Sequence, residues 1–169
     1  LSEDSYDFDV KGQFQNRIQA YKFNGSLKTG SSKPKIEVII SGGTWHSYPK
    51  EYRKQVATEV YWAANTMNEA RPIKSLEEEI LENETAEYLI VGLTAETRPD
   101  QITPESIIEM LEQGFTRIQL GEQTDNDAIL KKVNRKGYVA DSIRAHRLLK
   151  QAAFKLVVHL MPDLPGSSP

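Results

Sequence analysis

The chain has 169 residues, of which 38% are hydrophobic and 27% are charged, and its formal net charge is -3. This composition is typical of a globular domain, and no apolar run approaches the length of a membrane span, so no membrane partner is expected. The absence of cysteine excludes disulfides, thiolate metal sites and cysteine nucleophiles within these residues. The acidic start at residues 1–9 is unlike a signal peptide, and an initial Leu1 favours a trimmed chain or part of a longer one.

Charge is unevenly distributed along the chain. Residues 69–87 are strongly acidic, whereas residues 131–155 are basic and contain Asp141 as their one acidic residue. A basic stretch in an acidic protein fits a surface that meets phosphates, although charged helix faces are about as often simply solvated. The acidic stretch is expected to be a surface feature.

Hydrophobic periodicity predicts alternating strands and helices. Residues 1–34 are expected to form a tail, a helix over 13–23 and a polar loop, and residues 35–169 to form the main domain. Thr103 and Asp141 are the expected N-caps of the helices that follow them. The expected strands are 36–41, 88–95, 116–121 and 155–161, and the expected helices of the main domain are 49–67, 76–81, 104–114, 125–133 and 141–152.

This alternation, with connections long enough for crossovers, predicts an α/β fold with a parallel sheet covered by helices. A doubly wound sheet and a (β/α) barrel both meet the pattern. Four strands cannot close a barrel, and an ordinary (β/α)8 barrel needs roughly 250 residues. We therefore expect a partial (β/α) barrel that is incomplete in this chain.

Each predicted strand has one apolar face, and its other face carries a polar side chain near the carboxyl end. These polar residues are Ser41, Glu96, Gln123 and His159. Because such groups are costly to bury unpaired, they indicate either a polar network that satisfies itself or a ligand site. Parallel sheets place ligands at the carboxyl ends of their strands, so we favour a small-molecule site.

The first predicted strand runs directly into Gly42 and Gly43, which Thr44 follows. Paired glycines expose backbone N–H groups and let a turn approach a ligand closely. For one Gly-Gly pair alone, a tight turn without a ligand is the simpler explanation. The polar residues at the other strand ends shift the balance toward a ligand.

Several common enzyme signatures are absent from the sequence. It has no Gly-x-Ser-x-Gly elbow, no His-Glu-x-x-His motif, no phosphate loop ending in Lys-Ser/Thr and no complete dinucleotide fingerprint. His46, His146 and His159 lack the spacing of metal ligands, so no metal site is expected here. Glu96 and Asp100 are weak candidates for an acid–base pair, and no catalytic residue is assigned.

Five motifs occur in an order and spacing that resemble a known family. They are Ser-Gly-Gly-Thr-Trp at 41–45, Glu-Thr-Arg-Pro-Asp at 96–100, Leu-Gly-Glu-Gln-Thr at 120–124, Asn-Arg at 134–135 and His-Leu-Met-Pro-Asp-Leu-Pro at 159–165. Over about residues 35–166, the chain resembles the radical S-adenosylmethionine (SAM) domain of the catalytic subunit of the Elongator complex. That family contains the tRNA uridine(34) acetyltransferases.

The resemblance implies an enzyme that modifies the wobble uridine of tRNA with acetyl-CoA, and that carries SAM and a [4Fe-4S] cluster in a partial (β/α) barrel. The cluster cysteines and the acetyltransferase domain are absent from these residues, so this chain alone is expected to be inactive. The implied partners are tRNA and, if the source is eukaryotic, other Elongator subunits. The implied location is cytoplasmic.

The resemblance also implies roles for individual residues. The Gly42–Thr44 turn would hold the amino group of SAM, and Glu96 would lie near its methionine moiety. Gln123 and His159 would contact the ribose, and Arg135 would contact the carboxylate.

Four further residues are expected to face the substrate or to support the site. Arg98 and Asp100 belong to the Glu-Thr-Arg-Pro-Asp motif, and Lys131 and Lys132 open the basic stretch.

Two alternatives stay open. A cluster-free (β/α) scaffold or tRNA-binding module would keep the barrel without redox chemistry, which the absence of cysteine favours. An unrelated (β/α) enzyme acting on a phosphorylated metabolite would not use the basic stretch to bind tRNA.

Overall fold

The structure is a computed structural model that describes residues 9–27 and 33–167. Most of the predicted N-terminal tail and the centre of the predicted polar loop, residues 28–32, lie outside this range. Within the described ranges, no helix is both long enough and apolar enough to cross a membrane.

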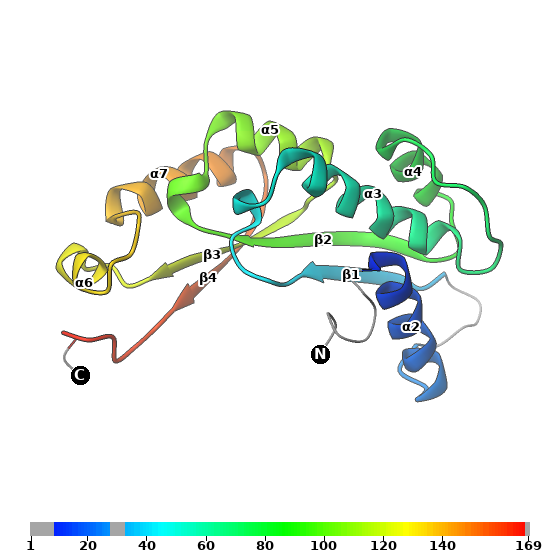
Figure 1. Ribbon diagram of the computed structural model, residues 1–169, viewed down its shortest axis with the longest axis horizontal. Helices are drawn as coiled ribbons and strands as arrows, with labels where there is room; N and C mark the ends of the chain where they lie inside the picture. Colours follow the sequence, from blue (N-terminus) through cyan, green and yellow to red (C-terminus); the bar gives the residue numbers. More distant parts are fainter. Residues whose placement is uncertain (1–8, 28–32, 168–169) are drawn as a thin grey trace. The chain divides into compact units, whose positions relative to one another are not determined.

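The elements follow the predicted alternation, with bounds shifted by at most three residues (Figure 1). The strands are β1 (Lys35–Ile40), β2 (Leu89–Thr97), β3 (Arg117–Gln123) and β4 (Lys155–Leu160). The α-helices are α2 (Val10–Phe23), α3 (Lys50–Asn65), α4 (Leu76–Asn83), α5 (Pro104–Glu112), α6 (Asp127–Lys132) and α7 (Val139–Gln151). Two short 3-10 helices are η1 (Trp45–Ser47) and η2 (Pro99–Gln101).

The four strands form one sheet in the order β1-β2-β3-β4. The pairs β2–β3 and β3–β4 are parallel, with Glu96 opposite Gln119 and Gly121 opposite His159. Strand order that follows chain order is the arrangement of a (β/α) barrel, whereas a doubly wound sheet reverses its order at a switch point. The predicted partial (β/α) barrel is confirmed.

The chain divides into two compact units. Unit 1 comprises Leu1–Val38 and Pro49–Gly92, and unit 2 comprises Ile39–Tyr48 and Leu93–Pro169. This division differs from the predicted domain boundary between residues 34 and 35, which stays a prediction.

Unit 1 has a small apolar core and a polar network beside it. Ile18 of α2, Ala64 of α3 and Tyr88 form the centre of the core. The hydrophobic side chains packed around them are Phe14, Leu27, Ile36, Met67 and Ile90. Ser75 starts α4 with a capping box, and this start places Leu76, Glu79 and Asn83 on one buried face of the helix.

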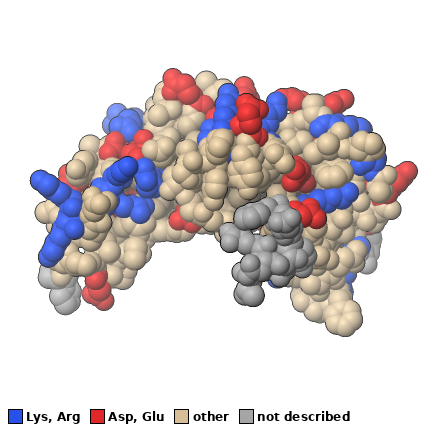
Figure 2. Space-filling view, in the orientation of Figure 1, with Lys and Arg blue, Asp and Glu red and all other residues tan. Residues whose placement is uncertain are grey.

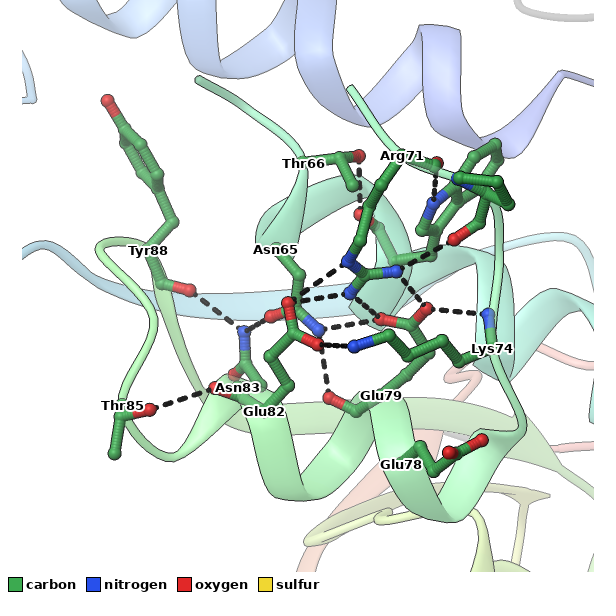
Figure 3. A network of polar contacts seen from close by, with 12 residues as sticks. Asn65, Thr66, Arg71, Lys74, Glu78, Glu79, Glu82, Asn83, Thr85 and Tyr88 are labelled. Atoms are coloured by element: carbon green, nitrogen blue, oxygen red, sulfur yellow. Dashed lines mark hydrogen bonds and ion pairs between the residues drawn. The ribbon is translucent and has the colours of Figure 1, made fainter. Parts of the chain in front are cut away.

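Glu79 is the centre of the polar network in unit 1 (Figure 3). Its side chain is fully buried, although the acidic stretch was expected to be a surface feature. Arg71 donates to both of its carboxylate oxygens, Asn65 Nδ2 donates to Oε2 at 2.8 Å, and the backbone N–H of Lys74 donates to Oε1 at 2.9 Å. The expectation was wrong for Glu79, because these donors compensate its burial.

Unit 2 packs α5 and α7 along its strands (Figure 1). Thr103 caps α5 as predicted, since its Oγ1 accepts a hydrogen bond from Ser106 N at 3.2 Å. Asp141 was wrongly predicted as an N-cap. It occupies the third position of α7 and accepts from the backbone N–H of the N-cap, Tyr138, at 2.9 Å. The buried apolar side chains of this unit include Ile107, Met110, Phe115, Ile118, Leu120, Ala145 and Leu149.

The predicted apolar strand faces are buried only in the middle of the sheet. Ile118 and Leu120 of β3 are fully buried, whereas Val158 and Leu160 of β4 are 36% and 65% exposed. Because β4 ends the strand order, it has a neighbouring strand on one side only. Alternation in the sequence predicts which side chains share a face, but not how much of that face a helix covers.

Candidate functional site

The glycine turn after β1 belongs to unit 2 and adopts a backbone conformation that favours glycine. Gly42 has φ of +143° and Gly43 has φ of +99°. The hydroxyl of Tyr48 donates a hydrogen bond to the carbonyl oxygen of Gly42 at 3.1 Å. Apart from Gly43 and its two chain neighbours, no described residue has an atom within 4 Å of where a Cβ on Gly43 would be, so space is open beside this residue.

The residues after the glycines tie the turn to the carboxyl end of β2. Trp45 is 3% exposed and packs edge-on against Phe115, with ring centroids 5.4 Å apart. His46 Nδ1 lies 3.1 Å from the hydroxyl oxygen of Thr97, the last residue of β2. The turn is therefore held beside the strand end that carries Glu96.

Glu96 and His159 come together on one face of the sheet. Glu96 pairs with Gln119, and Gly121, two residues further along β3, pairs with His159 of β4. Paired residues of parallel strands point to the same face, so Glu96 and His159 share it. His159 Nδ1 lies 3.5 Å from Glu96 Oε1, and both side chains are about one-third exposed, which leaves them accessible to a ligand.

The end of β3 is irregular and strained. The register slips between Gly121 and Gln123, and Gln123 has φ of +72°. A non-glycine residue in this region costs on the order of 1–3 kcal/mol, and such strain clusters at functional sites. The amide oxygen of Gln123 is buried and has no hydrogen-bond partner among the described residues. It is a candidate acceptor for a ligand hydroxyl.

Arg135 lies beside Gln123, over Gly121. Its Nη2 donates to the carbonyl oxygen of Gly121 at 2.7 Å. A Cβ at position 121 would lie 2.8 Å from Arg135 Nη2 and 3.0 Å from Gln123 Nε2. Gly121 therefore leaves the space that both side chains occupy.

A family model described as the radical SAM superfamily matches residues 27–169. This chain belongs to the radical SAM superfamily.

Relatives of known name agree with this assignment. The radical SAM chain is 40% identical over 163 residues to a tRNA uridine(34) acetyltransferase of Methanocaldococcus infernus, covering 96% of this chain and 29% of the relative. It is 32% identical over 159 residues to Elongator complex protein 3 of Saccharomyces cerevisiae, covering 94% of this chain and 27% of the relative. The resemblance to the Elongator catalytic subunit is confirmed, and the chain spans less than a third of the length of these relatives.

A solved structure agrees as well. The archaeal Methanocaldococcus infernus Elp3 with an N-terminal deletion (1–46) superposes on this radical SAM chain with a TM-score of 0.88 at 38% identity. The match covers 99% of this chain and 37% of that chain.

Arg98 and Asp100 of this radical SAM chain are paired with each other. Arg98 Nε and Nη2 donate to the two carboxylate oxygens of Asp100 at 2.9 and 2.8 Å, and Gln101 Nε2 donates to Oδ2 at 2.8 Å. Partial burial alone would raise the pKa of Asp100, but these hydrogen bonds and the charge of Arg98 hold it below its usual range. Such a pair stiffens the segment after β2, and the expected role of these two residues in supporting the site or facing the substrate stays a prediction.

Lys131 and Lys132 end α6 and are exposed. Figure 2 shows Lys and Arg side chains gathered over α6 and α7. The exposed basic residues there include Lys131, Lys132, Lys136, Arg144, Arg147 and Lys150.

Metal ligands do not gather in the described part of the chain, where no three His, Cys, Asp or Glu side chains come together. Iron–sulfur clusters are held mainly by cysteine thiolates, and the 169 residues contain no cysteine. This stretch of sequence therefore supplies no thiolate for a [4Fe-4S] cluster.

Sequence reasoning missed several residues that shape the site. Tyr48 and His46 fasten the glycine turn, and Glu122 pairs with His146 next to Gln123. These contacts join separate elements or depend on a local turn, so no spacing in the sequence indicates them. The one available signal was that Glu122 is a charged residue within the Leu-Gly-Glu-Gln-Thr motif, directly before Gln123.

Proposed function

We propose that this chain is the SAM-binding segment of an Elongator-type enzyme that acetylates the wobble uridine of tRNA with acetyl-CoA. One observation carries the proposal: the residues expected around SAM gather at the carboxyl ends of β2, β3 and β4. Glu96 lies 3.5 Å from His159, and Gln123 and Arg135 share the space over Gly121.

The charges at these strand ends complement those of SAM, which carries a cationic ammonium and sulfonium and an anionic carboxylate. Glu96 would attract the cationic methionine part, next to backbone groups of the Gly42–Thr44 turn that would hold the ammonium. Arg135 retains further N–H donors beyond the one bound to Gly121, and these would pair with the carboxylate.

The ribose of SAM would lie against Gln123 and His159. The buried amide oxygen of Gln123 supports this role, because a ribose hydroxyl would supply the hydrogen bond that it lacks among the described residues. Bound together with a reduced [4Fe-4S] cluster, SAM supplies radical chemistry in this superfamily. The residues of this chain bind and orient it.

The names of its relatives support a proposal for the substrates of the whole protein. We propose tRNA as the partner of the exposed basic surface at α6 and α7, because lysines and arginines bind phosphates without requiring a particular base. Acetyl-CoA would bind outside these residues. The cytoplasmic location and, in a eukaryotic source, the contact with other Elongator subunits stay predictions.

The direct test is titration calorimetry of SAM with the full-length protein. Glu96→Ala and Gln123→Ala should each raise the Kd by about tenfold or more, the cost of losing one or two polar contacts. Glu112→Ala and Gln151→Ala, at exposed ends of α5 and α7, are matched controls that should bind as the wild type does.

Absence of SAM binding by the wild-type protein would overturn the proposal, as would site variants that bind as tightly as the controls. Binding of tRNA without any binding of SAM would fit the cluster-free tRNA-binding module instead. Acetylation of tRNA by the full-length protein with acetyl-CoA tests the remaining part.

A further inference from the structure

Glu122 is the extra residue of the irregularity at the end of β3. Gly121 pairs with His159 and Gln123 pairs with the next residue, Leu160, so Glu122 has no partner position in β4. A bulge of this kind re-aims the side chains around it. Here it directs Glu122 to α7, and Gln123 follows with φ of +72°.

The side chain of Glu122 fastens the bulge to α7. Its Oε1 pairs with His146 Nε2, and the Glu122 side chain is only 15% exposed. His146 follows Ala145, which is fully buried on α7, so the helix position of the imidazole is set by packing. Arg135 fastens the preceding residue through the 2.7 Å hydrogen bond to Gly121 O. The bulge is thus held at adjacent residues, by α7 and by the loop that precedes it.

Gln123 lies immediately after these two attachments. Its backbone is in a region that a non-glycine residue keeps only when its surroundings impose it. Its buried amide oxygen lacks a partner in the described part of the chain, so this conformation presents an acceptor that the protein does not use itself.

We propose that Glu122 and His146 are positioning residues that hold Gln123 in its ligand-facing conformation. This inference rests on the proposed function, because the ligand of Gln123 is taken to be SAM. The competing explanation is that the Glu122–His146 pair stabilises unit 2 without affecting Gln123 in particular.

A double-mutant cycle on the full-length protein separates the two explanations, with the Kd of SAM as the measured quantity. Glu122→Leu should raise the Kd about tenfold in the wild-type background and leave it unchanged in a Gln123→Ala background, where no amide remains to be positioned. His146→Leu breaks the same contact from α7 and should reproduce the result. Glu122→Gln keeps a hydrogen-bonding group for His146 and should stay within about threefold of the wild type.

Glu109→Leu is the matched control for general destabilisation, because it removes the hydrogen bond that Gln113 Nε2, just after α5, donates to Glu109. It should lower the melting temperature without raising the Kd. If Glu122→Leu fails to fold, His146→Leu decides the question.

Three results would overturn the inference. If the wild type binds SAM and both leucine variants bind equally well, Gln123 needs no positioning, and the SAM assignment stands. If the effect persists undiminished in the Gln123→Ala background, the pair acts by another route. If the wild type does not bind SAM, the proposed function and this inference fail together.

Discussion

The guanidinium of Arg71 donates one hydrogen bond to each oxygen of the Glu79 carboxylate, both with N–O distances of 2.7 Å (Figure 3). Glu79 is fully buried, and Arg71 arrives from the loop that precedes α4. Arg71 also pairs with Glu82 at 2.8 Å, and its carbonyl oxygen accepts from Trp62 Nε1 at 3.0 Å. One arginine therefore joins the loop, α3 and α4 of unit 1.

Replacing Arg71 with Met should destabilise the protein strongly, because it leaves the buried Glu79 carboxylate without its cationic partner. Breaking one partner of a buried ion pair costs about 3–5 kcal/mol. Chemical denaturation of the wild type and the variant measures this difference in the free energy of unfolding.

Lys54→Met is the matched control, since the Lys54–Glu77 pair is exposed and its charged atoms lie 3.6 Å apart. Such an exposed pair contributes little to stability, so Lys54→Met should change the free energy of unfolding far less than Arg71→Met does. Equal effects of the two substitutions would show that the Arg71 network contributes no more than a surface pair.

Stability should fall as the pH drops below the usual range of a glutamate. Burial alone would raise the pKa of Glu79, but hydrogen bonds from Arg71, Lys74 and Asn65 outweigh it and lower the pKa. The pKa of Asp100 is lowered as well. A group with a lowered pKa in the folded state stabilises the protein above its unfolded-state value, about 4 for these side chains. That stabilisation is lost as the pH falls through the folded-state value.

The measurement is the free energy of unfolding by urea between about pH 6 and pH 3, a window that spans the unfolded-state pKa. Glu79→Gln removes one of the titrating groups, so its stability should decline less steeply with pH than that of the wild type. Parallel pH profiles for the two proteins would contradict the role assigned to Glu79.

Gly43→Ala should weaken SAM binding by about tenfold or more. A Cβ fits sterically, but φ of +99° is unfavourable for alanine, so the turn has to shift at a cost of about 1–2 kcal/mol. Gly25→Ala is a close control, since Gly25 also has a positive φ of +75° and open space around it, and it follows α2 in unit 1.

Both glycine substitutions should lower the melting temperature by similar amounts, and only Gly43→Ala should raise the Kd of SAM. A Gly43→Ala protein that binds SAM normally would remove the turn from the site. The two readouts are differential scanning fluorimetry and titration calorimetry.

Reversing the charges of Lys131 and Lys132 should weaken tRNA binding by the full-length protein. The logarithm of the tRNA affinity falls linearly with the logarithm of the salt concentration. Each phosphate contact that is lost makes this slope shallower by about one. The double variant Lys131→Glu/Lys132→Glu should therefore bind tRNA at least tenfold more weakly at low salt, with a slope reduced by about two.

Lys35→Glu/Lys50→Glu is the control for net charge, because both lysines are exposed and lie outside the basic stretch. It should change tRNA affinity far less. Equal affinities for all three proteins would instead fit an enzyme that acts on a phosphorylated metabolite.

Much of the fold could be predicted because secondary structure leaves a local signature. Helical and period-two spacing of apolar residues predicted each strand and α-helix, and Thr103 as the N-cap marked the start of α5. The N-cap of α7 was predicted three residues too late, at Asp141 instead of Tyr138, because an aspartate can cap a helix either as its N-cap or, as Asp141 does here, from its third position.

The amino-acid sequence by itself determined which side chains of the regular strand segments share a face, and so placed Glu96 and His159 on one face at the strand ends. Period-two alternation is a local property of a regular strand, and the bulge at Glu122 interrupts it just before Gln123. Only the tertiary structure decided that Glu79 is buried, that Gln123 adopts a positive φ, and that Glu122 contacts His146. These features depend on partners from other elements or on the register of neighbouring strands. The spacing of residues along one segment predicts neither the partners nor the register.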